Sequence, residues 1–534
     1  MSIESTHSSR VVSMASGTLV SRVTGVFRVM VLAWVLGFTP VADAFNLANT
    51  VPNMLFDLVL GGVAMATFIP VFVERLALDG ERRAWKSISS VITAALIILI
   101  AASIISWFCA PWIIDGFTVF QHASSTNSAV EIAQQRAVAT ELLRWFVPQI
   151  FFYGVIGIAT ALLNIRQRFG VATWVPVANN VVCIGVLVWF HLVDPNPVLS
   201  SLNGSRDLLW LGLGTTLGVA VQFLCLLPSL ARSDLWRLSF HLDFKDPAVK
   251  SVGRLSSWIL LVVLANQLSL YVVLAYAFGI GGSGQVSAYT YGWSFMLMPY
   301  AVVVVSVLSA LTPQLAGFAT SHDYAALSER LRFGLRQSLV IIIPCTVVLI
   351  VLSQPIVAIL LNHVNATHKI PAGTVLAVLA AGLPGFTVFQ LCVRGLQSMQ
   401  RARNVFALYA FENLLTILLC VLLGRHSLAG LTASVSIGYS VSAFAALVVL
   451  ARHHVNILTG VWSVHVRRSL WASLVSGFVI ALIYAVPTWT RGVGLVARFS
   501  AATIVGVLAY LVVVVVLRRR VRRGTTKSAR LEQF

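Results

Sequence analysis

The chain has 534 residues, of which 58% are hydrophobic and only 10% are charged, and its net charge at pH 7 is +19. Soluble domains carry roughly 25% charged residues, so this composition excludes a soluble globular protein and indicates an integral membrane protein without a large soluble domain. The six cysteines lie in or beside apolar segments without paired spacing, which is typical of packing residues and not of disulfides or metal ligands.

Apolar segments long enough to cross a bilayer recur along the whole chain. One crossing needs about 20 residues. The sequence therefore predicts an all-α membrane protein with about fourteen transmembrane helices, at 12–38, 44–73, 88–114, 142–163, 171–193, 208–230, 256–280, 287–318, 338–361, 373–399, 404–423, 428–451, 469–488 and 496–517.

Lysine and arginine divide the loops into two alternating sets. The loops at 75–86 and 232–254 are rich in them, whereas those at 37–43 and 280–286 contain none. The positive-inside rule places the basic loops, both termini and a basic tail at 521–534 in the cytoplasm of a multi-pass cell-membrane protein. The tail is also expected to touch anionic membrane lipids.

Two sequence echoes indicate an internal repeat. VLAWVLGF at 31–38 resembles VLAYAFGI at 273–280, and each is followed at a similar distance by a proline, Pro70 or Pro313. FVPQIFF at 146–152 pairs with GLPGFTVFQ at 382–390. Parallel repeats of this kind place the substrate site between two lobes. We predict an N-lobe at 1–240 (six helices), a C-lobe at 241–455 (six helices) and two extra helices at 456–520.

Two arginines, Arg22 and Arg28, lie in the middle of the first predicted helix. An arginine at bilayer depth is costly and almost always faces a protein interior or a water-filled cavity. Small residues on the same face, such as Gly17 and Gly25, are explained by close helix packing, but the two guanidinium groups are not. The pair predicts a cavity that receives an anion.

The second predicted helix carries a polar stripe that lipid would not tolerate. The stripe consists of Asp43, Asn46, Asn49, Thr50, Asn53, Asp57 and Gly61. It faces either a polar lumen or other helices through hydrogen bonds and ion pairs, and Asp43 could simply cap its own helix. Asp57 is a candidate ion-pair partner of Arg22 or Arg28 in one conformation. The predicted substrate-binding residues are Arg22, Arg28, Asp43, Asn49, Asn53 and Asp57.

Polar residues are sparser in the second half. Glu412 and Asn413 lie at mid-membrane, and Asn266 belongs to a cluster with Gln267 and Ser269. Hard cations prefer oxygen ligands, so Glu412, Asn413 and Asn266 are candidates for a coupling-ion site. The alternative is a buried acid that is kept protonated or paired.

Signatures of catalysis are absent from the sequence. It has no GxxxxGK[ST] phosphate loop, no metal-ligand spacing and no Ser-His-Asp or Cys-His arrangement. We therefore expect a non-enzyme without metal or cofactor and without a nucleic-acid partner. Any driving force would come from the membrane potential, protons or sodium.

The run SRVTGVFR, followed by ADAFNLANTVPNMLFDLVLGG, resembles the start of the MurJ/MviN family of lipid II flippases. These belong to the multidrug/oligosaccharidyl-lipid/polysaccharide exporter superfamily. Further matches are AYTYGWSFMLMPY at 288–300 and LCVRGLQSMQRARN at 391–404, and the pattern looks like the branch from high-GC Gram-positive bacteria. The resemblance implies two lobes plus two helices, transport of lipid-linked peptidoglycan precursor, and roles for Arg22, Arg28 and Asp43.

The chain also departs from the family pattern. Many members have arginines after the Pro-Asn of the second helix, where this chain has Met54, Leu55 and Phe56, and another in the eighth helix, where it has Ser294. The sequence does not show which residues would bind a phosphate group in place of these arginines.

The sequence is compatible with three functions. The forked N–H donors of arginine match the oxygens of a pyrophosphate, and side-chain amides can bond the hydroxyls of a sugar. This chemistry favours a lipid II flippase that works by alternating access and supports peptidoglycan synthesis and cell shape. Another polyprenyl-linked polysaccharide flippase is the nearest alternative. A non-transporting membrane scaffold that binds cell-wall synthesis proteins is the third, but it leaves the polar stripes unexplained.

Overall fold

The computed structural model describes most of the chain, and all regular structure in the described part is helical. The described residues are 2–58, 72, 80–123, 128–166, 169–232, 239–241, 243, 247–360, 369–485 and 493–531. The chain divides into two compact units, Met1–Tyr291 and Gly292–Phe534. The lobe boundary expected at residue 240 stays a prediction.

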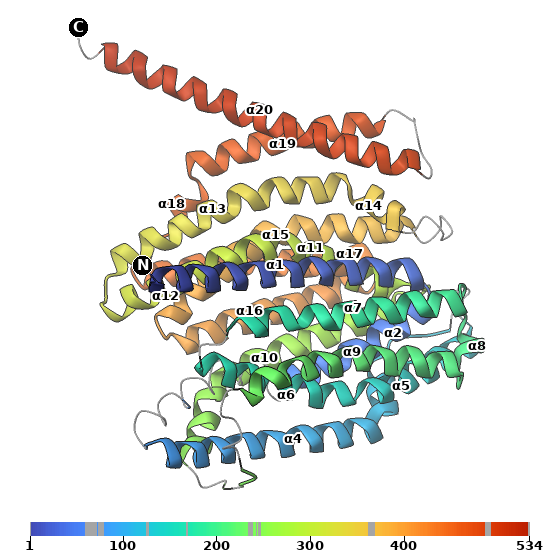
Figure 1. Cartoon of the computed structure of the whole chain (residues 1–534). Helices are drawn as coiled ribbons and strands as arrows, with labels where there is room; N and C mark the ends of the chain where they lie inside the picture. The colour runs from blue at the N-terminus through green and yellow to red at the C-terminus, as the bar shows by residue number, and fades with distance from the viewer. Residues whose placement is uncertain are drawn as a thin grey trace. The chain divides into compact units, whose positions relative to one another are not determined.

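The first unit is a bundle of long helices with one short helix between α7 and α9 (Figure 1). It contains α1 (Ser2–Leu36), α2 (Pro40–Phe56), α4 (Gly80–Phe117), α5 (Ala129–Phe146), α6 (Pro148–Ile165), α7 (Phe169–Val193), α8 (Leu199–Leu202), α9 (Arg206–Ala231), α10 (Pro247–Gly279) and the start of α11 (Gln285–Pro299).

The second unit is also helical, and its last two long helices, α19 and α20, run side by side (Figure 1). It contains the end of α11, a π-helical turn (Tyr300–Val304), α12 (Val305–Thr320), α13 (Tyr324–Val351), α14 (Ser353–Leu360), α15 (Lys369–Ser398), α16 (Ala402–Leu419), a second π-helical turn (Cys420–Gly424), α17 (Leu428–Arg452), α18 (Leu458–Val461), α19 (Val464–Ala485) and α20 (Val493–Leu531).

Thirteen spans within the described residues are long and apolar enough to cross a membrane. The remaining expected helix, at 44–73, corresponds to α2 and to residues beyond 58 that lie mostly outside the described part. The prediction of an all-α, multi-pass membrane protein is confirmed.

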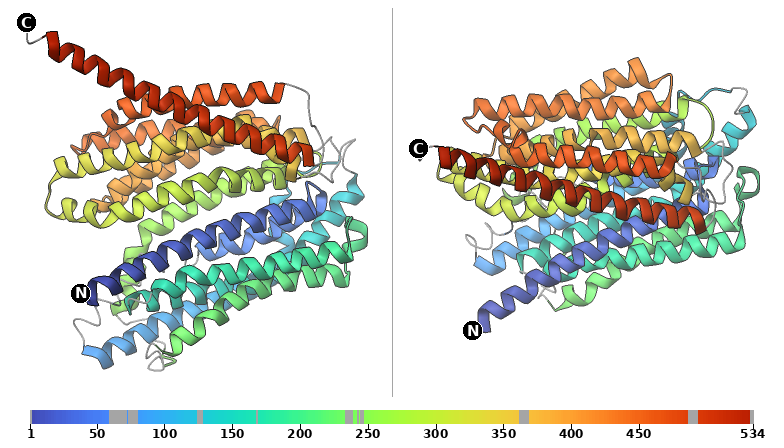
Figure 2. Two further views of the ribbon diagram at one scale, coloured as in Figure 1. Left: turned by 45° about the horizontal axis from the view of Figure 1, so that its top comes forward. Right: turned by 90° about the horizontal axis from the view of Figure 1, so that it is seen from above.

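Small and hydroxylated side chains bring the helices close together. In the first unit, α7 runs alongside both α1 and α9 (Figure 2), and Asn180 of α7 donates to the Thr24 hydroxyl of α1 over 3.0 Å. In the second unit, Gly382 of α15 faces Ser436 of α17, whose hydroxyl donates to the Val378 carbonyl over 2.8 Å. Such contacts replace the hydrophobic effect, which does not drive helices together in lipid.

One long transmembrane segment of the first unit is broken in the middle. Its first part, α5, ends at Phe146, and its second part, α6, begins at Pro148, whose ring nitrogen carries no hydrogen to continue the helix. The corresponding proline in the sequence repeat, Pro384, lies inside the uninterrupted helix α15. A proline alone therefore does not explain the break between α5 and α6.

The close approach of α15 and α17 gives a stability prediction. A Cβ atom on Gly382 would lie 2.7 Å from the Ser436 hydroxyl oxygen and 2.8 Å from its Cα, so Gly382→Ala should destabilise the protein by about 1–3 kcal/mol. The control is Gly317→Ala in α12, because nothing lies within 4 Å of the added methyl group. Thermal unfolding in detergent should show a lower midpoint for the Gly382 variant only. Equal midpoints would contradict this account of the α15–α17 contact.

Candidate functional site

The two arginines of α1 differ in their surroundings. The Arg22 side chain is exposed, whereas Arg28, six residues further along the same span, is half-buried. Within the part of the chain that the structure describes, neither guanidinium forms an ion pair with a carboxylate. Neither charge is therefore neutralised by a carboxylate of the described part of the chain.

Arg28 lies near neutral polar groups of two other helices. Its positive charge acts on the Cys183 thiol of α7 and on the Tyr153 phenol of α6. Tyr153 in turn packs against Phe56 at the end of α2, with ring centroids 5.8 Å apart.

Asp43 is 2% exposed and caps a helix other than its own. Its Oδ2 accepts from the Gly284 N–H over 2.7 Å, and its Oδ1 accepts from both the N–H and the hydroxyl of Ser287, each over 2.7 Å. The N-terminus of α2 is capped by Thr39, whose side chain accepts from the Ala42 N–H. The carboxylate thus stabilises the start of α11, where a negative charge is favoured.

A glycine makes this capping geometry possible. Gly284 has φ +82°, which side-chain-bearing residues rarely adopt, and a Cβ there would lie 2.4 Å from the Phe38 carbonyl oxygen. The connection between α10 and α11 can therefore approach α2 closely enough for its backbone N–H groups to reach Asp43.

The other polar side chains of the α2 stripe form separate hydrogen bonds. Asn46 donates to the Ser287 hydroxyl over 3.0 Å and so supports the Asp43 cap. Asn53 donates to the Asn49 carbonyl over 2.8 Å, within its own helix. Asp57, directly after α2, is exposed and accepts from Gln267 of α10 over 3.2 Å. In this conformation Asp57 makes no ion pair with Arg22 or Arg28 among the described residues.

Glu412 of α16 is a nearly buried acid in the second unit, 2% exposed. Its Oε1 accepts from the Thr416 hydroxyl over 3.1 Å, whereas its Oε2 has no hydrogen-bond partner in the described structure. Asn413 donates to the Tyr409 carbonyl over 2.7 Å. Asn266 belongs to the first unit, so its grouping with Glu412 stays a prediction. Within the described residues no three His, Cys, Asp or Glu side chains gather as a metal site would require.

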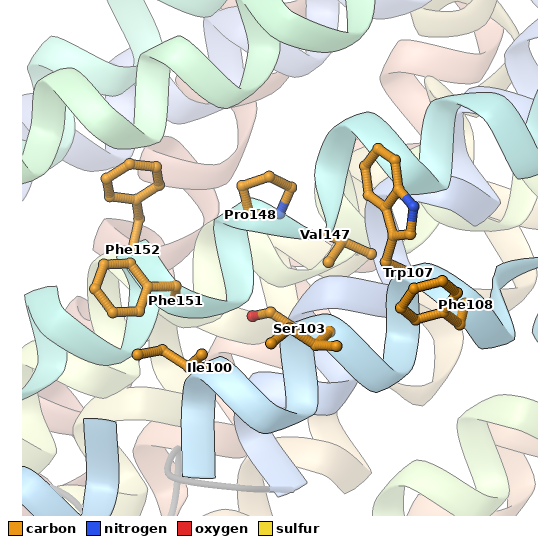
Figure 3. Close-up of a pocket in the computed structure, with 9 residues that line it drawn as sticks. Ile100, Ser103, Trp107, Phe108, Val147, Pro148, Phe151 and Phe152 are labelled. Carbon is orange, nitrogen blue, oxygen red and sulfur yellow. The ribbon is translucent and has the colours of Figure 1, made fainter. Parts of the chain in front are cut away.

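Two grooves in the first unit are apolar and contain none of the charged residues above. One, of about 450 Å³, lies between α4 and the break that separates α5 from α6, and Figure 3 shows its aromatic lining. The other, of about 760 Å³, lies between α7 and α9. Their chemistry suits hydrocarbon, so the polar candidate site is the region around Arg28.

Sequence reasoning missed the partners of Asp43 and the buried amide Gln149. Ser287 and Gly284 lie 241 or more positions from Asp43 and carry no signal of their own. Gln149 did carry one, because it is a polar residue directly after a proline in an otherwise apolar run. It is completely buried and is hydrogen-bonded to Thr216 and Tyr153.

Comparisons with known proteins agree on one family. The family model of the lipid II flippase MurJ matches residues 32–518. A lipid II flippase MurJ of Burkholderia cenocepacia is 28% identical over 442 residues, which are 79% of each chain.

Solved structures agree with this match at the level of the fold. Lipid II flippase MurJ in an inward closed conformation superposes with a TM-score of 0.75 at 19% identity, over 95% of this chain and 99% of that one. An inward-facing MATE transporter of the MOP superfamily gives a TM-score of 0.66 at 14% identity, over 83% and 96% of the two chains. This chain belongs to the lipid II flippase MurJ family.

Proposed function

We propose that this protein carries lipid II from the inner to the outer leaflet of the cell membrane and so supplies peptidoglycan synthesis. Membership of the MurJ family gives the substrate class. The proposal rests mainly on Arg28. This residue is half-buried within a membrane span and has no carboxylate partner among the described residues. Such a group in a transporter interior is a receptor for an anion.

The pyrophosphate of lipid II is the anion that Arg28 would bind. A guanidinium offers a planar fork of donors that matches phosphate oxygens, and the contact strengthens where water is scarce. Exposed Arg22 would guide the head group to Arg28, and Asn49, Asn53 and Asp57 would meet sugar hydroxyls. The polyprenyl tail would stay in the lipid throughout. Neither another polysaccharide lipid nor a scaffold role has a specific feature of this structure in its favour.

The Asp43 cap would control one opening of the transport path. Asp43 holds the first residues of α11, and this helix begins in the first unit and continues in the second. We propose that the three hydrogen bonds of Asp43 persist when the path is closed to the outside and break when it opens there. Alternating closure of this kind moves the head group without exposing it to lipid.

We further propose a topology with both termini in the cytoplasm, because the basic loops alternate with loops that lack lysine and arginine. No catalytic step is part of the cycle. Contacts with membrane lipids and with cell-wall synthesis proteins are proposed from the same role. Depletion of the protein should leave the lipid-linked precursor in the inner leaflet, and normal amounts in the outer leaflet would refute the function.

A coupling cation would act at Glu412. One carboxylate oxygen is held by Thr416, and the other has no protein partner in the described structure, which suits a proton or a sodium ion. The membrane potential adds about 2.3 kcal/mol per charge per 100 mV to any step that moves a charge across the whole membrane. Cation binding would favour one facing of the transporter over the other.

Arg28→Ala should reduce lipid II transport in proteoliposomes by about tenfold to a hundredfold, because hydrogen bonds to charged groups contribute about 1.5–3 kcal/mol. Arg28→Lys should retain part of the activity, since lysine keeps the charge and loses the fork. Protein level and thermal midpoint serve as controls for folding. Wild-type transport by the alanine variant would remove Arg28 from the binding site.

Asp43→Asn should loosen the cap on α11, because an amide nitrogen cannot accept from a backbone N–H. In a background without other cysteines, a cysteine placed at Ser283 should then react faster with an impermeant thiol reagent added from outside, and transport should fall. Asp115→Asn is the matched control, since Asp115 is exposed and makes only a 3.7 Å ion pair with Arg136. Equal labelling of both variants would argue against a gate at Asp43.

Glu412→Gln should abolish the dependence of transport on one cation gradient, because the amide keeps the shape of the side chain and cannot take up a proton or pair with a cation. Transport is measured with separately imposed proton and sodium gradients, which identifies the cation. Glu329→Gln, at an exposed position of α13, is the control. A Glu412 variant that keeps the wild-type dependence on both gradients would place coupling elsewhere.

A further inference from the structure

A small polar cavity lies beside the Asp43 cap in the first unit. It is enclosed by the start of α2, the residues after α4, the first turns of α5 and the connection between α10 and α11. Its volume is about 10 Å³, close to the space that one water molecule needs. Its lining includes Pro40, Asp43, Gln121, Glu131, Gln135 and Ser283. A sugar or a phosphate group is too large for this cavity, which has room for one water molecule or one metal ion.

Two hydrogen bonds orient the side-chain amide of Gln121. The Pro40 carbonyl can only accept, and it accepts from the Gln135 amide nitrogen over 3.1 Å. The Gln135 side-chain oxygen therefore faces Gln121 and accepts from its amide nitrogen over 2.7 Å. This leaves the Gln121 Oε1, which is buried and has no hydrogen-bond partner in the described structure. The residue is only 9% exposed, so its oxygen is costly to bury unless a donor or a cation reaches it.

Two carboxylates line the same cavity as this oxygen. Asp43 is held by its bonds to the start of α11, so it contributes mainly a negative charge. Glu131 is half-buried, and its backbone N–H donates to the Ser128 hydroxyl over 3.1 Å. Its carboxylate forms no ion pair or hydrogen bond with another residue that the structure describes. Arg136, on the next turn of α5, pairs instead with Asp115 over 3.7 Å.

The helix N-terminus alone does not explain this arrangement. A negative charge is favoured in the first turn of any helix. The start of α9 shows this simple case, with Ser205 as the cap and Asp207 in the first turn, as α5 has Ser128 and Glu131. The dipole of α5 accounts for Glu131, but it does not account for a second carboxylate and a buried amide oxygen on the wall of the same cavity.

We propose that this cavity is a calcium-binding site, in which the Glu131 carboxylate and the Gln121 side-chain oxygen are ligands. The Pro40 carbonyl is a further oxygen on the wall, and Asp43 adds its charge. Glu131 and Ser283 are half-buried, so an ion can enter from water. The loops at 37–43 and 280–286 lack lysine and arginine, which places this end of the protein outside in the proposed topology.

The charge and size of the cavity favour calcium over other occupants. Two carboxylates bring two negative charges, which one divalent cation balances. Calcium binds carboxylate, amide and backbone carbonyl oxygens in flexible geometry, whereas magnesium usually keeps several waters, for which this cavity has no room. A water molecule would satisfy Gln121 but would leave both charges uncompensated. No group of three His, Cys, Asp or Glu side chains exists among the described residues, and a calcium site does not need one because carbonyl oxygens also serve as ligands.

The test follows thermal unfolding of the purified full-length protein in detergent, freed of metal by a chelator, as calcium chloride is added. The midpoint of the wild type should rise, because the ion binds the folded state. Half of the rise should occur at about 0.1–1 mM calcium, the range of extracellular calcium modules. Magnesium chloride at the same concentrations and sodium chloride at the same ionic strength should give no comparable rise.

Three variants locate the ion. Glu131→Gln keeps the shape of the side chain and removes its charge, so it should raise the calcium concentration for half of the effect by at least about tenfold. Gln121→Leu removes the amide oxygen and should act in the same direction. The control is Asp207→Asn, which removes a half-buried first-turn acid from α9 and should keep the wild-type response. The midpoint without calcium shows whether each variant is folded.

Three results would overturn the inference. A wild type that does not respond to calcium has a cavity filled by water alone. A calcium response that Glu131→Gln leaves unchanged belongs to another part of the protein. Equal stabilisation by sodium or magnesium would remove the assignment to calcium. If Gln121→Leu does not fold, Glu131→Gln decides the matter, because it leaves the bonds between Gln121, Gln135 and Pro40 intact. No lipid II enters the measurement, so its result is independent of the proposed transport.

Discussion

Within a membrane, every buried polar group must find its hydrogen-bond partners inside the protein, because the surrounding hydrocarbon offers none. The described part of the first unit shows two ways of meeting this demand. The Asp43 carboxylate is used by three donors, two of them at Ser287. At the break between α5 and α6, Thr216 supplies the missing partner of the Trp145 carbonyl. These bonds join α2 to the start of α11 and α9 to the end of α5.

Two ionisable groups within membrane spans have remaining bonding capacity. Arg28 has no carboxylate partner among the described residues, and one oxygen of Glu412 has no hydrogen-bond partner there. An incompletely paired charge is expensive in a low-dielectric interior and persists where a ligand completes it. The two groups lie in different units, so anion binding and cation coupling would be tasks of separate halves of the chain.

The two halves show how a repeated sequence pattern can serve different chemistry. Pro148 and Pro384 are equivalent in the repeat, yet only the first lies at a helix break. The residue that follows each proline makes the difference clear. Gln149 needs two hydrogen-bond partners and finds them, whereas Gly385 allows α15 to approach α17 closely. Gln149 joins α6 to α9 through its hydrogen bond to Thr216, whereas Gly385 serves close packing.

The sequence by itself determined the helical membrane fold, because apolar spans of this length and loop charges of this pattern are properties of the chain alone. It also singled out Arg22, Arg28, Asp43 and Glu412, since ionisable residues in such spans are costly wherever they lie. Only the tertiary structure decided which partner each group has. Asp43 caps α11 through residues more than 240 positions away, and the charge of Arg28 acts on Tyr153 and Cys183. Contacts between distant segments depend on how the helices pack, which no local pattern encodes.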